Sequence, residues 1–152
     1  MTEGTEIPKE RKSRRGRPTV AKEQPNCPLE KKEHLWFMDW VRLNHWLKER
    51  THHSPNEGKR THGNGYVLKK MGMSPGFPDF FFYIPNGRYS GLAIELKRKT
   101  NYVISREQQA WIDRLNSDGY FATFAFGWEH AKMFVDNYLR EYDLWRRREK
   151  KW

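Results

Sequence analysis

The chain has 152 residues, which suits one domain with terminal extensions and leaves little room for a second. It carries 29 basic and 19 acidic residues, a formal net charge of +10, so we expect an anionic partner, most simply nucleic acid. Aromatic residues make up 15% of the chain, which indicates a folded core and excludes a wholly disordered chain.

The amino-acid sequence also excludes several classes of protein. The single cysteine, Cys27, rules out an intramolecular disulfide and a Cys-rich zinc site. The longest apolar run, Phe80–Pro85, is far shorter than the roughly 20 residues that span a bilayer. The polar N-terminus has no apolar signal-peptide region. We therefore expect a soluble protein of the cytoplasm, with no membrane partner.

Residues 1–28 predict a basic, disordered arm with almost no large apolar side chain. The Arg-Gly-Arg-Pro segment at 15–18 resembles the core of an AT-hook, in which two arginines enter a narrow A·T minor groove. In that case Arg15 and Arg17 contact DNA. The alternative is a solvated arm that is attracted to DNA without a specific contact.

The next elements follow from residue periodicity. Residues 30–49 predict one helix, whose apolar stripe is Trp36, Trp40, Leu43 and Leu47. The later elements are a short helix at 66–71 ended by Gly72, strands at 79–84 and 92–97, a helix from Ser105 to Gly119, a strand at 120–126, a helix from about 128 to 142, and a basic tail at 143–152.

A hairpin between the two strands at 79–84 and 92–97, centred on Gly87, pairs Asp79 with Glu95. Because side chains alternate faces along a strand, Lys97 then lies on the same face as both carboxylates. The opposite face is wholly apolar and predicts packing against helices: Phe80, Phe82, Ile84, Leu92, Ile94 and Leu96. A slip of one residue would bury the charged side chains, so the pattern specifies the register.

Two carboxylates and a lysine on one face are the groups that hydrolysis of a phosphodiester needs. Directly paired Cβ atoms lie about 5 Å apart, so Asp79 and Glu95 are placed to share one divalent cation. Mg²⁺ takes oxygen ligands and keeps several waters, so one or two carboxylates suffice. Lys97 is placed to orient or deprotonate the attacking water. The alternative is a cross-strand ion-pair cluster on a solvated face.

Several motifs in this order resemble a known family. The segments 76–79 (Gly-Phe-Pro-Asp) and 94–97 (Ile-Glu-Leu-Lys) resemble the signature of the PD-(D/E)XK nuclease superfamily. The segments 56–60, 68–79 and 105–111 resemble motifs of its VRR-NUC family, especially the small stand-alone phage and bacterial members. The resemblance covers about residues 30–139.

This resemblance implies an α/β fold: a restriction-endonuclease-like αβββαβ core with a mixed central sheet, here over residues 29–142. It implies a nuclease dependent on Mg²⁺ or Mn²⁺, with Asp79 and Glu95 as metal ligands and Lys97 as the catalytic lysine. It also implies an acidic residue on the first helix. Glu30 is expected to be this residue, and Glu33 is the alternative. The choice stays open because the family's helix has a glutamine where this sequence has His34.

Further roles stay open at this point. Gln108 is expected near the active site, where it positions the lysine or a water, but Ser105-x-x-Gln108 also has the pattern of a helix capping box. The first strand, before the 56–60 segment, is poorly specified and is expected to be short. Phosphate contacts from a basic face are expected of Lys59, Arg60, Lys69 and Lys70.

The sequence thus predicts a metal-dependent DNA endonuclease that acts on branched or flapped DNA, of the Holliday-junction resolvase-like type. A homodimer is expected, because a junction has two-fold symmetry. One alternative is a non-catalytic basic DNA-binding protein on a nuclease scaffold. Another is a sequence-specific nicking or restriction enzyme. The pattern does not separate junction from flap, DNA from RNA, or Mg²⁺ from Mn²⁺.

Overall fold

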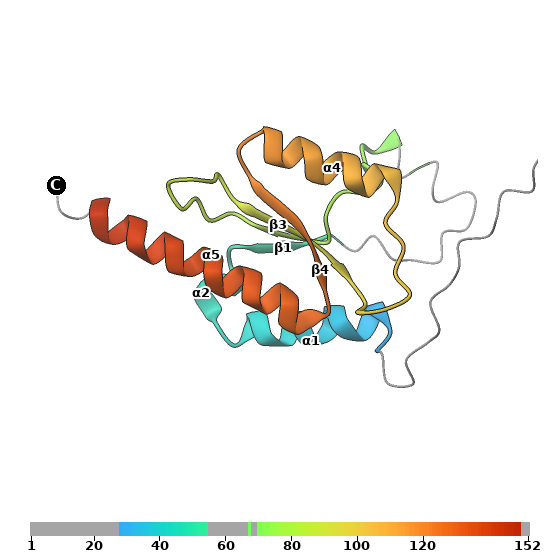
Figure 1. Cartoon of the computed structure of the whole chain (residues 1–152), viewed down its shortest axis with the longest axis horizontal. Coiled ribbons are helices and arrows are strands. Elements are labelled where there is room, and N and C mark those ends of the chain that lie inside the picture. The colour runs from blue at the N-terminus through green and yellow to red at the C-terminus, as the bar shows by residue number, and fades with distance from the viewer. Residues whose placement is uncertain (1–27, 55–66, 68–69, 150–152) are drawn as a thin grey trace, which may run out of the picture.

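The computed structural model describes residues 28–54, 67 and 70–149 (Figure 1). Its elements in chain order are α1 (Glu30–Arg42), α2 (His45–Lys48), β1 (Thr51–His53), β2 (Phe80–Phe82), β3 (Leu92–Lys97), α4 (Arg106–Ser117), β4 (Phe121–Phe126) and α5 (Trp128–Glu149). Val67 and Lys70 are helical, as expected for the segment before Gly72. No helix within these described ranges is long and apolar enough to cross a membrane.

Some predicted contacts fall outside this part of the chain. The N-terminal arm with Arg15 and Arg17 lies outside the described residues, and so do Lys59, Arg60 and Lys69. Their expected contacts with DNA stay predictions.

The four described strands form one mixed sheet in the order β1-β2-β3-β4. The β1–β2 and β2–β3 pairs are antiparallel, and the β3–β4 pair is parallel because α4 carries the chain back across the sheet (Figure 1). The predicted α/β fold with a mixed central sheet is confirmed. The first strand is short, as expected, with three residues.

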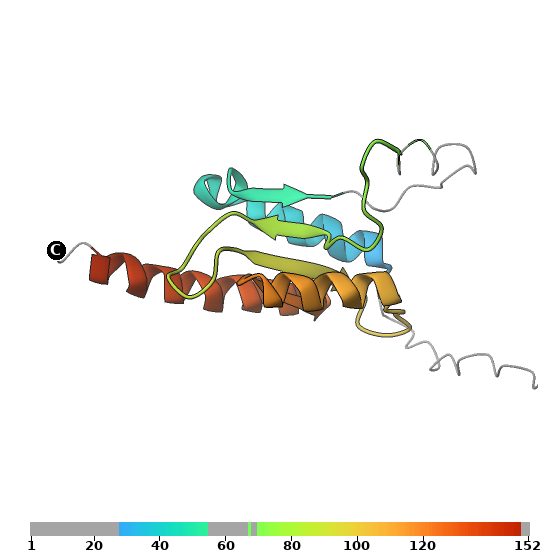
Figure 2. The same cartoon turned by 90° about the horizontal axis from the view of Figure 1, so that it is seen from above.

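The hairpin register is also as predicted. Phe80 pairs with Ile94 and Phe82 with Leu92, so the continuation of the ladder places Asp79 opposite Glu95. The face predicted to be apolar packs against α1 and α5, which lie on one side of the sheet, while α4 covers the other side (Figures 1 and 2). The larger cluster includes Phe37, Val41, Phe80, Phe82, Ile84, Leu92, Ile94, Leu96, Ala131, Val135 and Tyr138.

The prediction of one helix over 30–49 is wrong. The helix ends at Arg42, and Asn44 starts a second short helix by accepting a hydrogen bond from the Leu47 backbone N–H at 3.1 Å. The proposed stripe is right for Leu47, which is buried, and for Trp40, which packs against the core, but wrong for Trp36 and Leu43, which are 43% and 84% exposed. The side chains of α1 that face the sheet are Glu33, His34, Phe37 and Val41.

The last helix is longer than predicted. It continues from Trp128 to Glu149, so the basic residues at 146–148 form its last turn, where they complement the helix dipole. Within this extension, the Trp145 ring packs against the turn at Gly87. A Cβ added at Gly87 would lie 2.4 Å from the Trp145 ring, so this turn requires glycine.

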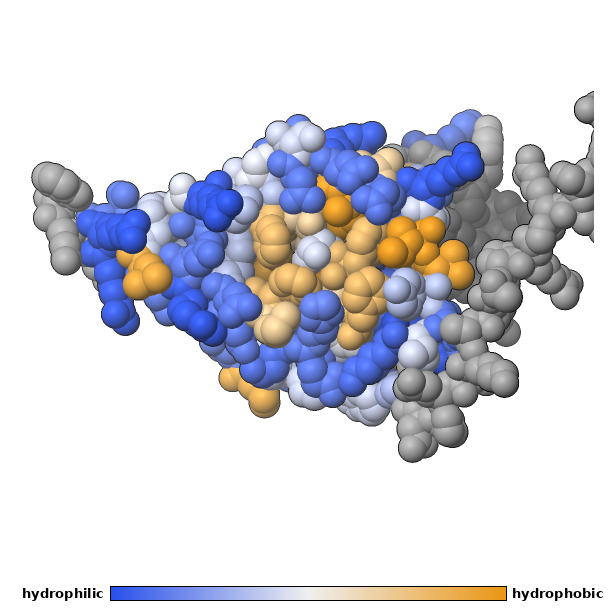
Figure 3. Space-filling view, in the orientation of Figure 1, coloured by the Kyte–Doolittle hydropathy of each residue, from blue (hydrophilic) through white to orange (hydrophobic). Residues whose placement is uncertain are grey.

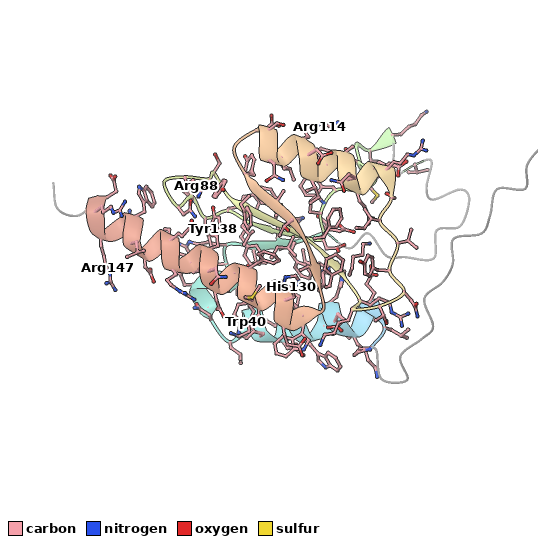
Figure 4. All side chains as sticks on the ribbon, in the orientation of Figure 1. Trp40, Arg88, Arg114, His130, Tyr138 and Arg147 are labelled. Carbon is pink, nitrogen blue, oxygen red and sulfur yellow. The ribbon has the colours of Figure 1, made fainter. Side chains whose placement is uncertain are left out.

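The free edge of β4 lies on the face shown in Figure 3, where apolar side chains gather between α4 and α5. Both outward backbone groups of Ala122 are paired with the Asn116 side chain, at 2.9 and 3.0 Å. His130, between α5 and β4 in Figure 4, accepts a hydrogen bond from the Phe126 backbone N–H. These side chains occupy sites at which another strand would pair.

Candidate active site

The predicted catalytic residues meet at the end of the sheet where β3 finishes. Asp79 directly precedes β2, Glu95 and Lys97 lie in the last half of β3, and Gln108 lies in the first turn of α4. The N-terminal turn of α1 reaches the same end (Figure 1). Arg88 and Arg147 lie at the opposite end of the molecule (Figure 4).

These charged side chains are buried. Asp79 is 3% exposed, Glu95 is 2% exposed and Lys97 is 5% exposed, because α4 covers this face of the sheet. An ion-pair cluster on a solvated face is therefore excluded. Burying charge is costly unless it is compensated, so such a cluster is more typical of a functional site than of a stabilising one.

Glu95 is the centre of the cluster. Its Oε1 accepts a hydrogen bond from the Gln108 amide and lies 3.0 Å from Lys97 Nζ. Its Oε2 is buried and has no hydrogen-bond partner. A buried carboxylate oxygen without a partner is expensive, and its lone pairs are available to a cation.

The two alternative roles of Gln108 turn out to be compatible. Its side-chain oxygen accepts a hydrogen bond from the Ser105 backbone N–H at 2.9 Å, and the Ser105 hydroxyl accepts one from the Gln108 backbone N–H. The capping box is thus present. Its amide nitrogen still donates to Glu95. The cap fixes the side chain that orients the carboxylate.

The Asp79 carboxylate is held from two sides. Its Oδ2 accepts a hydrogen bond from the Leu96 backbone N–H at 2.9 Å and lies 3.5 Å from His34 Nε2. His34 also lies 3.3 Å from the Leu96 carbonyl oxygen. In the sequence, His34 stands out only as a departure from the family's glutamine. Because His34 lies one turn after Glu30, the sequence places both side chains on the same face of the helix.

The structure separates the two acidic residues of α1. Glu30 Oε1 lies 3.6 Å from Lys97 Nζ, so Glu30 is beside the cluster. Glu33 is fully buried, and its Oε2 accepts a hydrogen bond at 2.8 Å from the backbone N–H of Trp128 at the start of α5. That carboxylate complements the helix dipole and joins α1 to α5. The geometry therefore favours Glu30 over Glu33 at the active site.

The charged side chains of the cluster change one another's pKa. Burial and, after it, the neighbouring Asp79 carboxylate raise the pKa of Glu95 to about 7, although the Lys97 ammonium partly opposes them. Burial lowers the pKa of the Lys97 ammonium, but the Glu95, Glu30 and Asp79 carboxylates outweigh burial, so the pKa lies above its ordinary value. Lys97 is therefore a cation, and Glu95 exchanges its proton near neutral pH.

This gives a pH-dependent stability in the metal-free protein. Because the folded pKa of Glu95, about 7, exceeds its ordinary value of 4.5, the folded state binds the proton more tightly than the unfolded state. The contribution of Glu95 to the free energy of unfolding is therefore full below pH 4.5 and is lost as the pH rises through about 7. Thermal melts between pH 5 and 8 should show this loss in the wild type and not in Glu95→Gln. Parallel curves for the two proteins would contradict the raised pKa.

The donor set suits a hard cation. Two buried carboxylates that repel each other, one with an unpartnered oxygen, are the ligands that Mg²⁺ or Mn²⁺ takes with several waters. Among the described residues, no three Asp, Glu, His or Cys side chains converge as a ready metal cage.

Lys70, the remaining predicted phosphate contact in this part of the chain, is exposed near the beginning of the loop that leads to Asp79.

Two comparisons with known proteins found a similar family and a similar structure. Residues 20–127 match the model of the VRR-NUC domain. A solved structure described as a VRR_NUC domain protein superposes with a TM-score of 0.66 and 27% sequence identity, covering 74% of this chain and 89% of that one. No curated protein matches the chain.

Proposed function

The chain belongs to the VRR-NUC family, a nuclease-type family, and from this premise we propose that it is a divalent-metal-dependent DNA endonuclease. The observation that carries the proposal is the buried Asp79–Glu95–Lys97 cluster. A folded scaffold that only bound DNA would gain nothing from two buried, mutually repelling carboxylates.

Each residue has a role that follows from its contacts. Asp79 and Glu95 would hold Mg²⁺ or Mn²⁺, and Glu30 is the nearest acidic side chain of α1. When bound there, the cation would supply Lewis-acid stabilisation of charge on the phosphate. The Leu96 backbone N–H and the Gln108 amide keep the two carboxylates in place. Lys97, as a cation, positions the attacking water and offsets the charge that develops on the phosphate.

The substrate in this proposal is branched or flapped DNA. The net charge of +10 supports binding to the phosphate backbone without sequence readout. A homodimer would present two matched sites to a four-way junction, whose symmetry is two-fold. A non-catalytic DNA-binding protein and a sequence-specific nicking enzyme are the alternatives.

The test is a cleavage assay on four DNA substrates: a four-way junction, a flap, a linear duplex and a single strand. Each is incubated with Mg²⁺, with Mn²⁺ and with EDTA, and a flap made of RNA is included. We expect cleavage of the branched substrates with either metal and none with EDTA. Binding without cleavage under all conditions would support the non-catalytic alternative. Cleavage of duplex at one sequence would support the nicking enzyme.

A further inference from the structure

A hollow of about 430 Å³ opens next to the active site, between β1, the loop that precedes β2, and α4. Phe77 and Trp111 form an aromatic wall, Met73 adds a thioether, and polar groups come from His52, Ser54 and Ser74. The volume lies within the range of about 300–1,000 Å³ that ligand pockets have.

The hollow is connected to the active site by two short links. The Ser54 backbone N–H donates a hydrogen bond of 2.7 Å to the Asp79 carbonyl oxygen. Trp111 follows Gln108 by three residues on α4, so the two side chains are neighbours on the helix surface. A group in the hollow would therefore lie beside a phosphate held at Asp79 and Glu95.

The aromatic wall is held in place. The Trp111 indole N–H donates to the Pro75 carbonyl oxygen at 3.1 Å, and its ring meets Phe77 edge-on at 5.1 Å. Gly76 lets this loop approach α4 closely, since a Cβ there would lie 2.6 Å from the Glu107 carbonyl carbon. The loop and the helix thus form one rigid wall, which is the preorganisation that a binding pocket needs.

The lining chemistry is that of a base-binding pocket. Every nucleobase has a π-face that stacks on aromatic side chains, and hydroxyl and imidazole groups pair with base edges. Among the described residues that line this hollow, none is acidic. A second aromatic hollow lies around Trp36, Trp40 and Trp128; Figure 4 shows the position of Trp40. Asp39 and Glu129 border this second hollow, and their carboxylates would repel a phosphate backbone.

We propose that the hollow beside Trp111 holds an unpaired nucleobase of the strand that is cut. This rests on the proposed nuclease function and names what selects the substrate. A base inside a duplex is stacked and paired, and taking it out costs free energy. Branched and flapped DNA offers unpaired bases without that cost. The hollow thereby favours such substrates without reading sequence.

The experiment measures base capture separately from cleavage. A flap DNA carries 2-aminopurine at one unpaired position at a time, next to the branch, and Ca²⁺ replaces Mg²⁺ so that binding proceeds without cutting. We expect quenching of 2-aminopurine fluorescence at one position or at two adjacent ones. Trp111→Leu should remove this quenching and weaken flap binding by about 10- to 100-fold, while duplex binding changes little.

Two further variants make the result decisive. Ser74→Leu obstructs the hollow with an aliphatic side chain that does not quench fluorescence, and it should also remove the quenching; it decides the question if Trp111→Leu fails to fold. Trp36→Leu removes a half-exposed tryptophan from the acidic hollow and should leave the quenching unchanged. Persistent quenching in Ser74→Leu, loss of quenching in Trp36→Leu, or bound flap with no quenched position would overturn the proposal. A protein that quenches but cuts no DNA with Mg²⁺ would refute the nuclease function alone.

Discussion

Replacing Glu95 with glutamine is expected to lower the rate of DNA cleavage by at least about 10³-fold while leaving DNA affinity nearly unchanged. Glutamine keeps the size of the side chain but removes the negative charge that a divalent cation requires. On the proposed function, phosphate contacts would come from the chain's many basic residues, so binding should not depend on this carboxylate. Single-turnover cleavage with Mg²⁺, beside fluorescence anisotropy with Ca²⁺, measures the two quantities separately.

Glu33→Gln is the matched control for this variant. Glu33 is equally buried and also has one unpartnered oxygen, but its other oxygen accepts a hydrogen bond from the backbone at the start of α5, which a glutamine oxygen can still accept. We expect this variant to cut DNA at close to the wild-type rate. A Glu95→Gln protein that cleaves as fast as the wild type would show that the assigned site is wrong. A Glu33→Gln protein that folds but fails to cleave would restore Glu33 as a candidate ligand.

Replacing Lys97 with alanine is expected to slow cleavage by about 10²–10⁴-fold without loss of metal affinity. Lys97 Nζ lies 3.0 Å from Glu95 and 3.6 Å from Glu30, and its raised pKa keeps it charged. Its removal takes a positive charge away from the cation site, so metal binding should hold or improve. The attacking water loses its positioning group, and the developing phosphate charge loses a partner.

The measurement combines single-turnover cleavage with calorimetric titration of Mn²⁺. Lys97→Arg should restore only part of the rate, because a planar guanidinium is longer and is shaped differently from a compact ammonium. Lys99→Ala is the control, since Lys99 lies two residues further along and pairs with Glu129 instead. If Lys97→Ala loses metal binding but cleaves normally at saturating Mn²⁺, the lysine is a structural partner of the carboxylates and has no part in the mechanism.

The local features of the site are those that the sequence determined. The alternation of apolar and charged residues has one register that buries the apolar face, so the pairing of Asp79 with Glu95 follows from the pattern alone. The capping box at Ser105 is equally local, because a cap depends on residues within one helical turn. The short first strand and the mixed sheet were predicted with the help of the family motifs.

Tertiary packing decided the rest. The face of α1 that is buried depends on where the sheet lies, so Phe37 and Val41 form the core and Leu43 is left in solvent. The last turns of α5 bring Trp145 against the turn at Gly87, a contact between segments far apart in the chain that no local pattern predicts. Glu30 and Glu33 are equivalent by composition, and only the position of Trp128 assigns one to the backbone of α5 and leaves the other beside Lys97. The raised pKa of Glu95 likewise needs α4 above the sheet, because desolvation is a property of the packed fold and not of the strand.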